Sequence, residues 1–536
     1  MDLSPISIAT SDLHQFLAPV DDTAYTSRAP VSACLQGTCE DVIGEIVRCV
    51  KGGDRPVCWL SGSAGSGKSA VSQTIAQRYD NNGRLLASFF FLRGAGDRSN
   101  ITRLIPTLAY QLSISMPATT RFIRDVIQKE PGIFSQSRTH QFKRLVVEPI
   151  MAARNTIVAR LPWTKPAVIV MDALDECDDK DLMAEFIGAV LGAFQANRQL
   201  PFRVLFTSRV EEHIRQTLET PAACSAVHRL SLESFDARRD LHTFFQDRFS
   251  TIYKQNQRIM HDVPLPWPSE QEIDTLVKKS DGLFIFATTL MNFFIEASGL
   301  PHEKLQSVLE VEAGLDPLYM QVLSNTMHDQ NFERVIGTVV LLRQPLSITF
   351  LGWLLRLQTG HIVHSFLGTQ SILMIPEDDN QAIRPFHTSL PDFLKTESRC
   401  GKFFIDPSRR HLFIVIDCLA AMMVHPAGLF YREEQSYACM NWCYHFYQPF
   451  VEGKEDAVIE VLAMGVVAHL KDWAYLSLEF WVNYLIFKGW QIPLDQLTSL
   501  ITTLKVCTMC HLVWRDHLTA TFLAIATLSR RYYTGS

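Results

Sequence analysis

The chain has 536 residues, of which 47% are hydrophobic and 20% are charged, and its formal net charge is -6. This length predicts about two to four domains, and the composition is typical of a soluble globular protein. Because no strongly basic block accompanies the mild acidity, we expect no binding to nucleic acid. The first 30 residues lack a signal-peptide pattern and the apolar runs are too short to cross a bilayer, so we expect a cytoplasmic protein without a membrane span.

Changes in composition and in hydrophobic periodicity along the chain predict a tail followed by four regions. Residues 1–30 are polar, irregular and too short for a folded domain, so we expect a disordered or remnant tail there. Alternating strand and helix patterns come next, followed by helical periodicity, by mixed short elements, and by helical periodicity again. We therefore predict a sheet-containing core, a helical domain, a winged-helix-like domain and a helical C-terminal region, over residues 31–232, 233–324, 325–400 and 401–536 respectively.

The core region predicts an α/β fold with a parallel sheet, because apolar runs of strand length alternate with helical segments. The expected strands begin at Val57, Leu85, Ala167, Arg203 and Val227. A helix is expected over residues 68–79, before the stop signal "NNG". In the helical domain, Ser269 and Glu272 predict a helix start with a capping box.

The segment "GSAGSGKS" over residues 62–69 satisfies the complete P-loop pattern between a predicted strand and a predicted helix. Its glycines permit a tight turn and close backbone approach, so that N–H groups at a helix N-terminus can face phosphate oxygens. Lys68 adds a positive charge near the β- and γ-phosphates, and Ser69 offers a hydroxyl to Mg²⁺. The alternative is a glycine-rich turn without a ligand. We expect ATP or GTP with Mg²⁺, held by Gly62, Ser63, Ala64, Gly65, Ser66, Gly67, Lys68 and Ser69.

A P-loop needs an acidic partner at the end of a neighbouring strand. In the run "AVIVMDALDEC", Asp172 follows five apolar residues and is the expected metal-side carboxylate. Asp175 and Glu176 come next, within reach of a water that attacks the γ-phosphate, and we predict them as catalytic. The alternative is a solvated acidic turn, which the further acids Asp178 and Asp179 would fit.

A third predicted catalytic residue follows the strand that begins at Arg203. The run "RVLFTSR" places Arg209 just after this buried strand, where it can sense the γ-phosphate. The alternative is a surface arginine that pairs with Glu211 or Glu212. The strand at Leu85 lies in sequence between the P-loop and the acidic strand, which is typical of the additional-strand class of P-loop NTPases.

Cysteine and histidine pairs near the C-terminus raise a metal hypothesis. The segment "CTMCH" over residues 507–511 fits a short haem-attachment pattern, and Cys439, Cys443 and His445 fit zinc ligands. Helical spacing makes buried thiols the simpler interpretation.

Several of these segments occur in an order that resembles a known family. The series "CLQGTCEDV", "WLSGSAGSGKSAVSQTIA", "SFFFLRG", "VIVMDALDEC", "LFTSR", "DGLFIFA", "LDPLYMQVL" and "FHTSLPDFL" resembles the NACHT family of STAND NTPases, especially the fungal NOD-like-receptor-type proteins. The resemblance runs from about Cys34 to Met423, and its ordered motifs are specific.

The resemblance implies a signalling switch with slow ATP or GTP hydrolysis, acting in fungal innate immunity or heterokaryon incompatibility. Such proteins hold a diphosphate in a closed monomer, exchange it for the triphosphate and then oligomerise. The implied partners are further copies of the chain and an unidentified protein effector or trigger. The resemblance places "GLFIFA" near the nucleotide base and His387 against the β-phosphate of the diphosphate state; the alternative for His387 is a helix-capping or core histidine.

Some features depart from the family pattern and leave other functions open. Cys39 stands where an arginine is common in the fungal group, and the absence of an effector domain and of a repeat array fits a truncated member or an adaptor. One alternative function is a P-loop small-molecule kinase, although no basic, glycine-flanked lid segment is found. The other is a nucleotide-stabilised scaffold that never hydrolyses.

Overall fold

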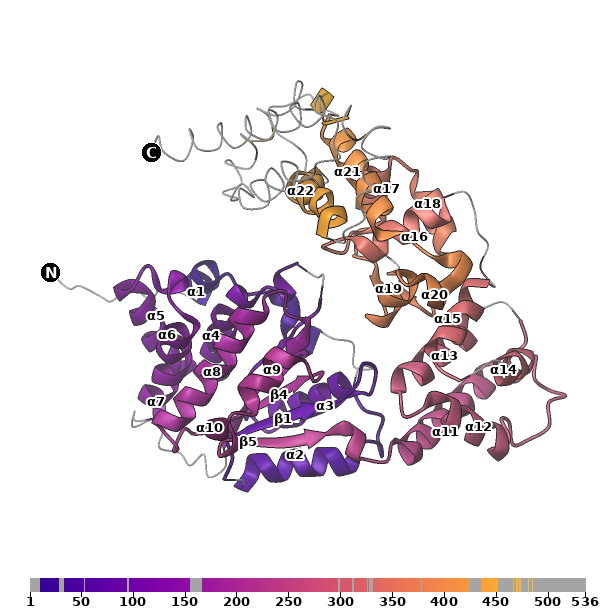
Figure 1. Ribbon diagram of the computed structural model, residues 1–536. Helices are drawn as coiled ribbons and strands as arrows, with labels where there is room; N and C mark the ends of the chain where they lie inside the picture. Colours follow the sequence, from indigo (N-terminus) through magenta and orange to yellow (C-terminus); the bar gives the residue numbers. More distant parts are fainter. Residues whose placement is uncertain are drawn as a thin grey trace. The chain divides into compact units, whose positions relative to one another are not determined.

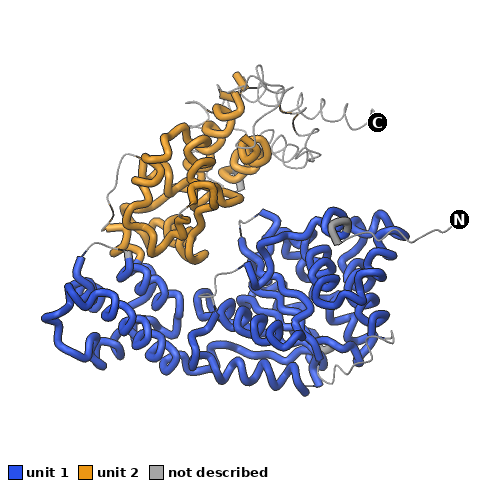
Figure 2. The backbone as a smooth tube through the Cα atoms, turned by 180° about the vertical axis from the view of Figure 1, so that it is seen from behind, with its two compact units in different colours: residues 1–318 blue, residues 319–536 orange. Residues whose placement is uncertain are grey.

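The chain forms two compact units, residues 1–318 and 319–536 (Figure 2). The computed structural model describes residues 10–27, 33–52, 54–93, 96–154, 166–296, 299–310, 313–324, 326, 331–376, 378–423, 435–451 and seven single residues between 466 and 484. Within these residues, no helix has the length and apolar character that crossing a membrane requires.

A five-stranded parallel sheet forms the centre of the first unit (Figure 1). All five expected strands are confirmed, as β1 (Val57–Ser61), β2 (Leu85–Phe90), β3 (Ala167–Asp172), β4 (Phe202–Ser208) and β5 (Val227–Ser231). Their spatial order is β2-β3-β4-β1-β5, so β4 separates β1 from β3, as expected of the additional-strand class. Because the strands are parallel, the segments that follow β1, β2, β3 and β4 meet at one edge of the sheet.

Helices cover both faces of the sheet because alternate side chains of each buried strand point to opposite faces. In β1, Cys58 and Leu60 join a core with α2 (Glu40–Gly52) and α3 (Lys68–Asp80). On the other face, Val57 and Trp59 join a larger core. The helices of that core are α1 (Thr10–Leu17), α4 (Leu104–Ser115), α5 (Thr120–Lys129), α6 (Arg138–Phe142), α7 (Glu148–Arg154), α8 (Lys180–Ala196), α9 (Glu212–Leu218) and α10 (Pro221–Cys224).

Residues 10–27 differ from the expected disordered or remnant tail. Leu13 and Leu17, one helical turn apart in α1, are only 2% and 1% exposed and belong to the larger core. Beyond this helix, the backbone N–H of Tyr25 donates to Ser88 Oγ at 3.0 Å. The expectation fails for this stretch because a short amphipathic segment gains stability from a partner face that its own sequence does not show.

Five helices follow the sheet within or at the end of the first unit (Figure 1). The expected capping box is confirmed, since the Ser269 hydroxyl accepts from Glu272 N–H and the Glu272 carboxylate accepts from Ser269 N–H. The helices are α11 (Ala237–Gln255), α12 (Glu270–Ser280), α13 (Phe284–Glu296), α14 (Pro301–Glu310) and α15 (Leu315–Ser324), the last of which crosses into the second unit.

In the part of the second unit that the structure describes, there are helices and one short antiparallel strand pair. The strands are β6 (Leu373–Met374) and β7 (Arg384–Pro385). The winged-helix assignment itself stays a prediction, as do the finer domain boundaries. The helices are α16 (Phe332–Leu341), α17 (Ile348–Leu355), α18 (Thr359–Phe366), α19 (Ser389–Leu394), α20 (Glu397–Cys400), α21 (Pro407–Met423) and α22 (Ser436–Val451).

The histidine of the zinc hypothesis takes part in a buried hydrogen-bond chain. His445 Nδ1 lies 2.7 Å from His411 Nδ1, and His445 Nε2 lies 2.7 Å from the Tyr437 hydroxyl. Cys439 and Cys443 are buried thiols, each 1% exposed. This agrees with the core interpretation of these residues. The segment "CTMCH" lies outside the described residues.

Candidate nucleotide-binding site

The P-loop has the backbone that its glycines were expected to provide. Gly65 and Gly67 have φ values of 75° and 105°, which residues with a side chain rarely adopt. A Cβ added to Gly62 would lie 3.0 Å from Ser66 Oγ, so a larger residue there would have to displace its neighbours. Helix α3 begins at Lys68, directly after this turn. The loop therefore places the N-terminus of α3, whose first N–H groups have no partner within the helix, at the edge of the sheet.

Lys68 is buried within the loop, with 9% of the residue exposed. Its ammonium group donates to the carbonyl oxygens of Gly62 and Ser63 at 2.8 and 2.7 Å. Burial lowers the pKa of Lys68, while the nearby charges of Asp175 and Asp172 oppose this shift. The positive charge is thus held at the loop, beside the acidic residues that follow β3.

Asp172 ends β3 and is 1% exposed. Its Oδ1 accepts from the hydroxyl of Ser72, at 2.8 Å, and from the hydroxyl of Thr207. Ser69 lies one turn before Ser72 and therefore on the same face of α3. Carboxylate and hydroxyl oxygens are ligands that Mg²⁺ prefers, so Ser69 and Asp172 fit the predicted metal site.

Asp175 and Arg209, which were predicted separately, form an ion pair. Arg209 Nε lies 3.2 Å from Asp175 Oδ2, and the backbone N–H of Arg209 donates to Asp175 Oδ1 at 2.9 Å. The Asp175 side chain is only 2% exposed. The structure therefore places Arg209 beside the acidic turn, and Asp175 is a buried partner of an arginine instead of a residue of a solvated turn.

Glu176 is partly buried beside this pair, and its Oε2 accepts from the backbone N–H of Arg93 at 3.2 Å. Burial raises the pKa of Glu176 to about 7, and the charge of Asp175 adds to the rise. A carboxyl group that titrates near neutral pH suits general-base chemistry.

If Glu176 is the general base that the sequence predicts, nucleotide hydrolysis should depend on pH through this residue. A general base must be unprotonated, so kcat/KM for nucleotide hydrolysis should fall as pH drops below about 7, approaching tenfold per pH unit. Discontinuous assays of phosphate release between pH 8 and 5.5 would measure this fall in kcat/KM. Nucleotide affinity over the same range is the control, because binding does not use the base. A level kcat/KM across this interval would contradict the role of Glu176.

Arg93 is a site residue that the sequence reasoning did not predict. It follows β2, and its Nη2 donates to the carbonyl oxygen of Asp175 at 2.9 Å. Its backbone N–H contacts Glu176, so one residue orders both acids. The available signal was the "SFFFLRG" motif, whose arginine follows a strand at the same edge of the sheet.

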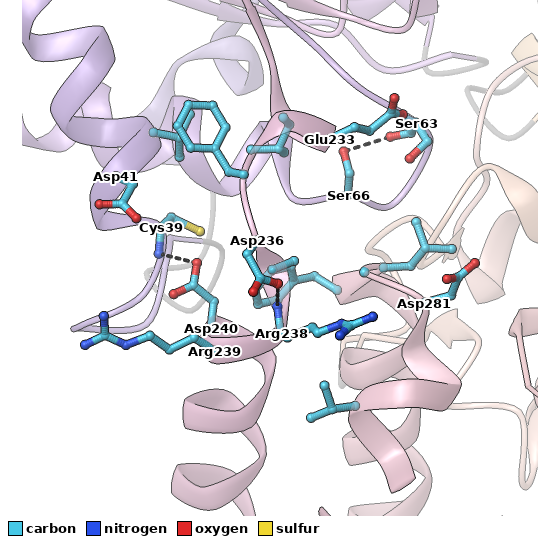
Figure 3. A pocket seen from close by; sticks show the side chains of 18 of the residues that line it. Cys39, Asp41, Ser63, Ser66, Glu233, Asp236, Arg238, Arg239, Asp240 and Asp281 are labelled. Atoms are coloured by element: carbon cyan, nitrogen blue, oxygen red, sulfur yellow. Dashed lines mark hydrogen bonds between the residues drawn. The ribbon is translucent and has the colours of Figure 1, made fainter. Parts of the chain in front are cut away.

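A cavity of about 440 Å³ lies beside the P-loop (Figure 3). Its lining includes Ser63 and Ser66 of the loop, Cys39 and the first turn of α2, residues 232–233 and 235–240, and residues 281–284. The volume is within the usual range of small-molecule pockets. If the phosphates of a nucleotide bind to the P-loop, its base and ribose would lie in this cavity.

The segment "GLFIFA" lies against the P-loop, and its expected place near the nucleotide base stays a prediction. The backbone N–H of Ile285 donates to the carbonyl oxygen of Gly65 at 3.0 Å. The Phe284 ring would be 3.6 Å from a Cβ at Gly67. On the same side, Glu233 Oε1 accepts from the Ser63 N–H at 3.1 Å. The helical region that follows the sheet therefore contacts the phosphate loop at two places. One contact comes from Glu233, and the other comes from α13.

His387 lies two residues before the first residue of α19, in the second unit. Its Nδ1 accepts from the Ser389 N–H at 3.1 Å and lies 2.7 Å from Ser389 Oγ. These contacts match the alternative of a helix-capping histidine. Because Nδ1 accepts a hydrogen bond from the Ser389 N–H, the neutral ring of His387 carries its proton on Nε2. A contact between His387 and the β-phosphate stays a prediction.

The sheet order and the glycine-rich loop after β1 define the class of fold, a P-loop NTPase. Residues 37–209, less than half of the chain, match the family model described as Nephrocystin 3, N-terminal. No curated protein matches the chain.

Solved structures are similar at low identity. A signal transduction ATPase with numerous domains (STAND) from Pyrococcus horikoshii, with a tetratricopeptide repeat sensor, is 13% identical, with a TM-score of 0.40, and the match covers 95% of this chain and 70% of that one. Drosophila ORC bound to poly(dA/dT) DNA and Cdc6 is 10% identical, with a TM-score of 0.24 and coverages of 97% and 72%. These values are too low to assign a function.

Proposed function

We propose that the protein is a nucleotide-dependent switch that binds ATP or GTP and hydrolyses it slowly. The observation that supports this most directly is the convergence of Lys68, Asp172 and the Asp175–Arg209 pair at one edge of the sheet. A buried cation in a phosphate loop beside buried carboxylates suits a triphosphate with its metal ion.

Each residue of the site has a proposed role. The P-loop N–H groups and Lys68 bind the phosphates, while Ser69 and Asp172 hold Mg²⁺, which neutralises phosphate charge when bound. Glu176 accepts a proton from the attacking water. Arg209 stabilises charge on the γ-phosphate, and Asp175 positions it through the 3.2 Å ion pair.

We further propose that the switch is of the STAND type, with a NACHT-like core and a winged-helix-like domain. The motif order and the family match over residues 37–209 support this. In this proposal a diphosphate keeps the chain closed with the help of His387, and the triphosphate permits oligomerisation. The partners are further copies of the chain and an unidentified effector or trigger, without nucleic acid, and the setting is cytoplasmic fungal innate immunity or heterokaryon incompatibility.

The nucleotide that co-purifies with the chain tests this proposal. We expect a tightly held diphosphate, identified by mass spectrometry after acid release, and a larger assembly by light scattering after exchange to a non-hydrolysable triphosphate. Protein kept in the diphosphate is the control for size. Rapid phosphorylation of a small metabolite would instead support a kinase, and an unchanged size with no turnover would support the scaffold.

A further inference from the structure

Two cysteines flank a tight turn at the edge of the cavity. The Thr38 N–H donates to the Leu35 carbonyl oxygen at 3.0 Å, and Gly37 has a φ of 85°. This is the pattern of a type II β-turn with glycine at its third position. Cys34 and Cys39 are the residues immediately before and after the turn, so its closure brings their side chains together.

The two thiols lie at positions that face each other across the turn, with Cys39 9% exposed and Cys34 partly exposed. The interaction with the Cys39 side chain lowers the pKa of the Cys34 thiol, which favours its reactive thiolate form. A thiolate beside a second thiol is the arrangement in which oxidation gives a disulfide.

The turn connects two elements that border the nucleotide. The Cys34 N–H donates to Thr74 Oγ1 of α3 at 3.0 Å. The Cys39 N–H donates to Asp240 Oδ2 of α11 at 2.9 Å, and both Cys39 and Asp240 line the cavity (Figure 3). A covalent link across the turn would restrict the motion of the cavity wall against the P-loop helix.

We propose that Cys34 and Cys39 are a site of reversible oxidative modification, whose disulfide fastens the wall of the cavity and slows nucleotide release. With glutathione disulfide as oxidant, the Cys34 thiolate attacks one sulfur and releases one glutathione. Cys39 loses its proton and attacks Cys34 Sγ, releasing the second glutathione. Two thiols are thereby oxidised to one disulfide, and one glutathione disulfide is reduced to two glutathiones.

A second pair of interacting thiols provides an internal comparison. The Cys58 side chain of β1 lowers the pKa of Cys49 of α2, but these residues are 1% and 7% exposed, within the core between the helices and the sheet. An oxidant reaches such sulfurs only when the core opens, so this pair should react more slowly.

The test begins with the full chain treated with glutathione disulfide and then alkylated. We expect a peptide that contains an intramolecular Cys34–Cys39 bond, lighter by about 2 Da than its reduced form, and reversal by dithiothreitol. Alkylation of both thiols after oxidation, or stable glutathione adducts on them, would overturn the proposal. This mapping needs no nucleotide.

The effect on release rests on the proposed function and is measured separately with a fluorescent diphosphate. Oxidised wild type should release it about threefold or more slowly than reduced protein. Cys34→Ser should release it at the reduced rate under both conditions, whereas Cys49→Ser should respond as wild type does. Equal release from both forms of the wild type would overturn the link to the cavity. Protein that binds no nucleotide in either form would refute the proposed function, while the disulfide map would still decide the modification.

Discussion

Replacing Lys68 by alanine should weaken nucleotide binding by about 100-fold. The ammonium group lies in the P-loop, where it contacts two backbone carbonyl oxygens and where phosphate would be its partner. Loss of a charge-assisted hydrogen bond in a buried site costs about 1.5–3 kcal/mol, and no neighbouring cation of the loop replaces it. Titration calorimetry with ATP and GTP would measure the change.

Lys51→Ala is a matched control, because Lys51 is an exposed lysine in the last turn of α2. It should bind nucleotide as wild type does. If Lys68→Ala keeps wild-type affinity while thermal unfolding shows an intact fold, the proposed nucleotide site would be wrong at its central residue. If Lys68→Ala loses affinity because the variant is unfolded, the same thermal unfolding curves would show it.

Glu176→Gln should lower the hydrolysis rate by about 100-fold or more and leave nucleotide binding nearly unchanged. Glutamine keeps the shape of the side chain and can still accept from the Arg93 N–H, but it cannot take a proton from water. The measurement is single-turnover phosphate release together with affinity. The variant should also stay longer in its triphosphate-bound assembly, because that state is removed by hydrolysis.

Glu212→Gln is the control for this exchange. Glu212 lies on the outer face of α9, 62% exposed, where it pairs with Arg215. Its loss should leave turnover unchanged. If Glu176→Gln hydrolyses nucleotide at the wild-type rate, another group must be the general base. If the wild type itself shows no detectable hydrolysis, the result favours the scaffold.

Local signals predicted the sheet and the phosphate loop well. Each strand is an apolar run of strand length, and the P-loop is defined by residue types at consecutive positions. The capping box at Ser269 is equally local, since its two partners are three residues apart. Such features are determined by neighbours in sequence, so the sequence suffices to find them.

The contacts among the site residues were harder to predict. The sequence suggested that Arg209 pairs with an adjacent glutamate if it lies on the surface, whereas it pairs with Asp175, which follows β3. In addition, the hydroxyl of Thr207, near the end of β4, donates to Asp172 at the end of β3. Both contacts arise because β3 and β4 are neighbours in the sheet, which brings their C-terminal ends together.

The sequence by itself determined the class of chemistry: a glycine-rich loop with a lysine and a hydroxyl, followed by acids at the ends of buried strands. Only the tertiary structure decided which of these groups touch, that Arg93 orders both acids, and that a turn flanked by Cys34 and Cys39 borders the cavity. The physical reason is that side-chain types and backbone turns follow from short-range sterics and hydrogen bonding. Burial, pKa and ion pairing depend on residues that only the order of the strands and the packing of helices bring together.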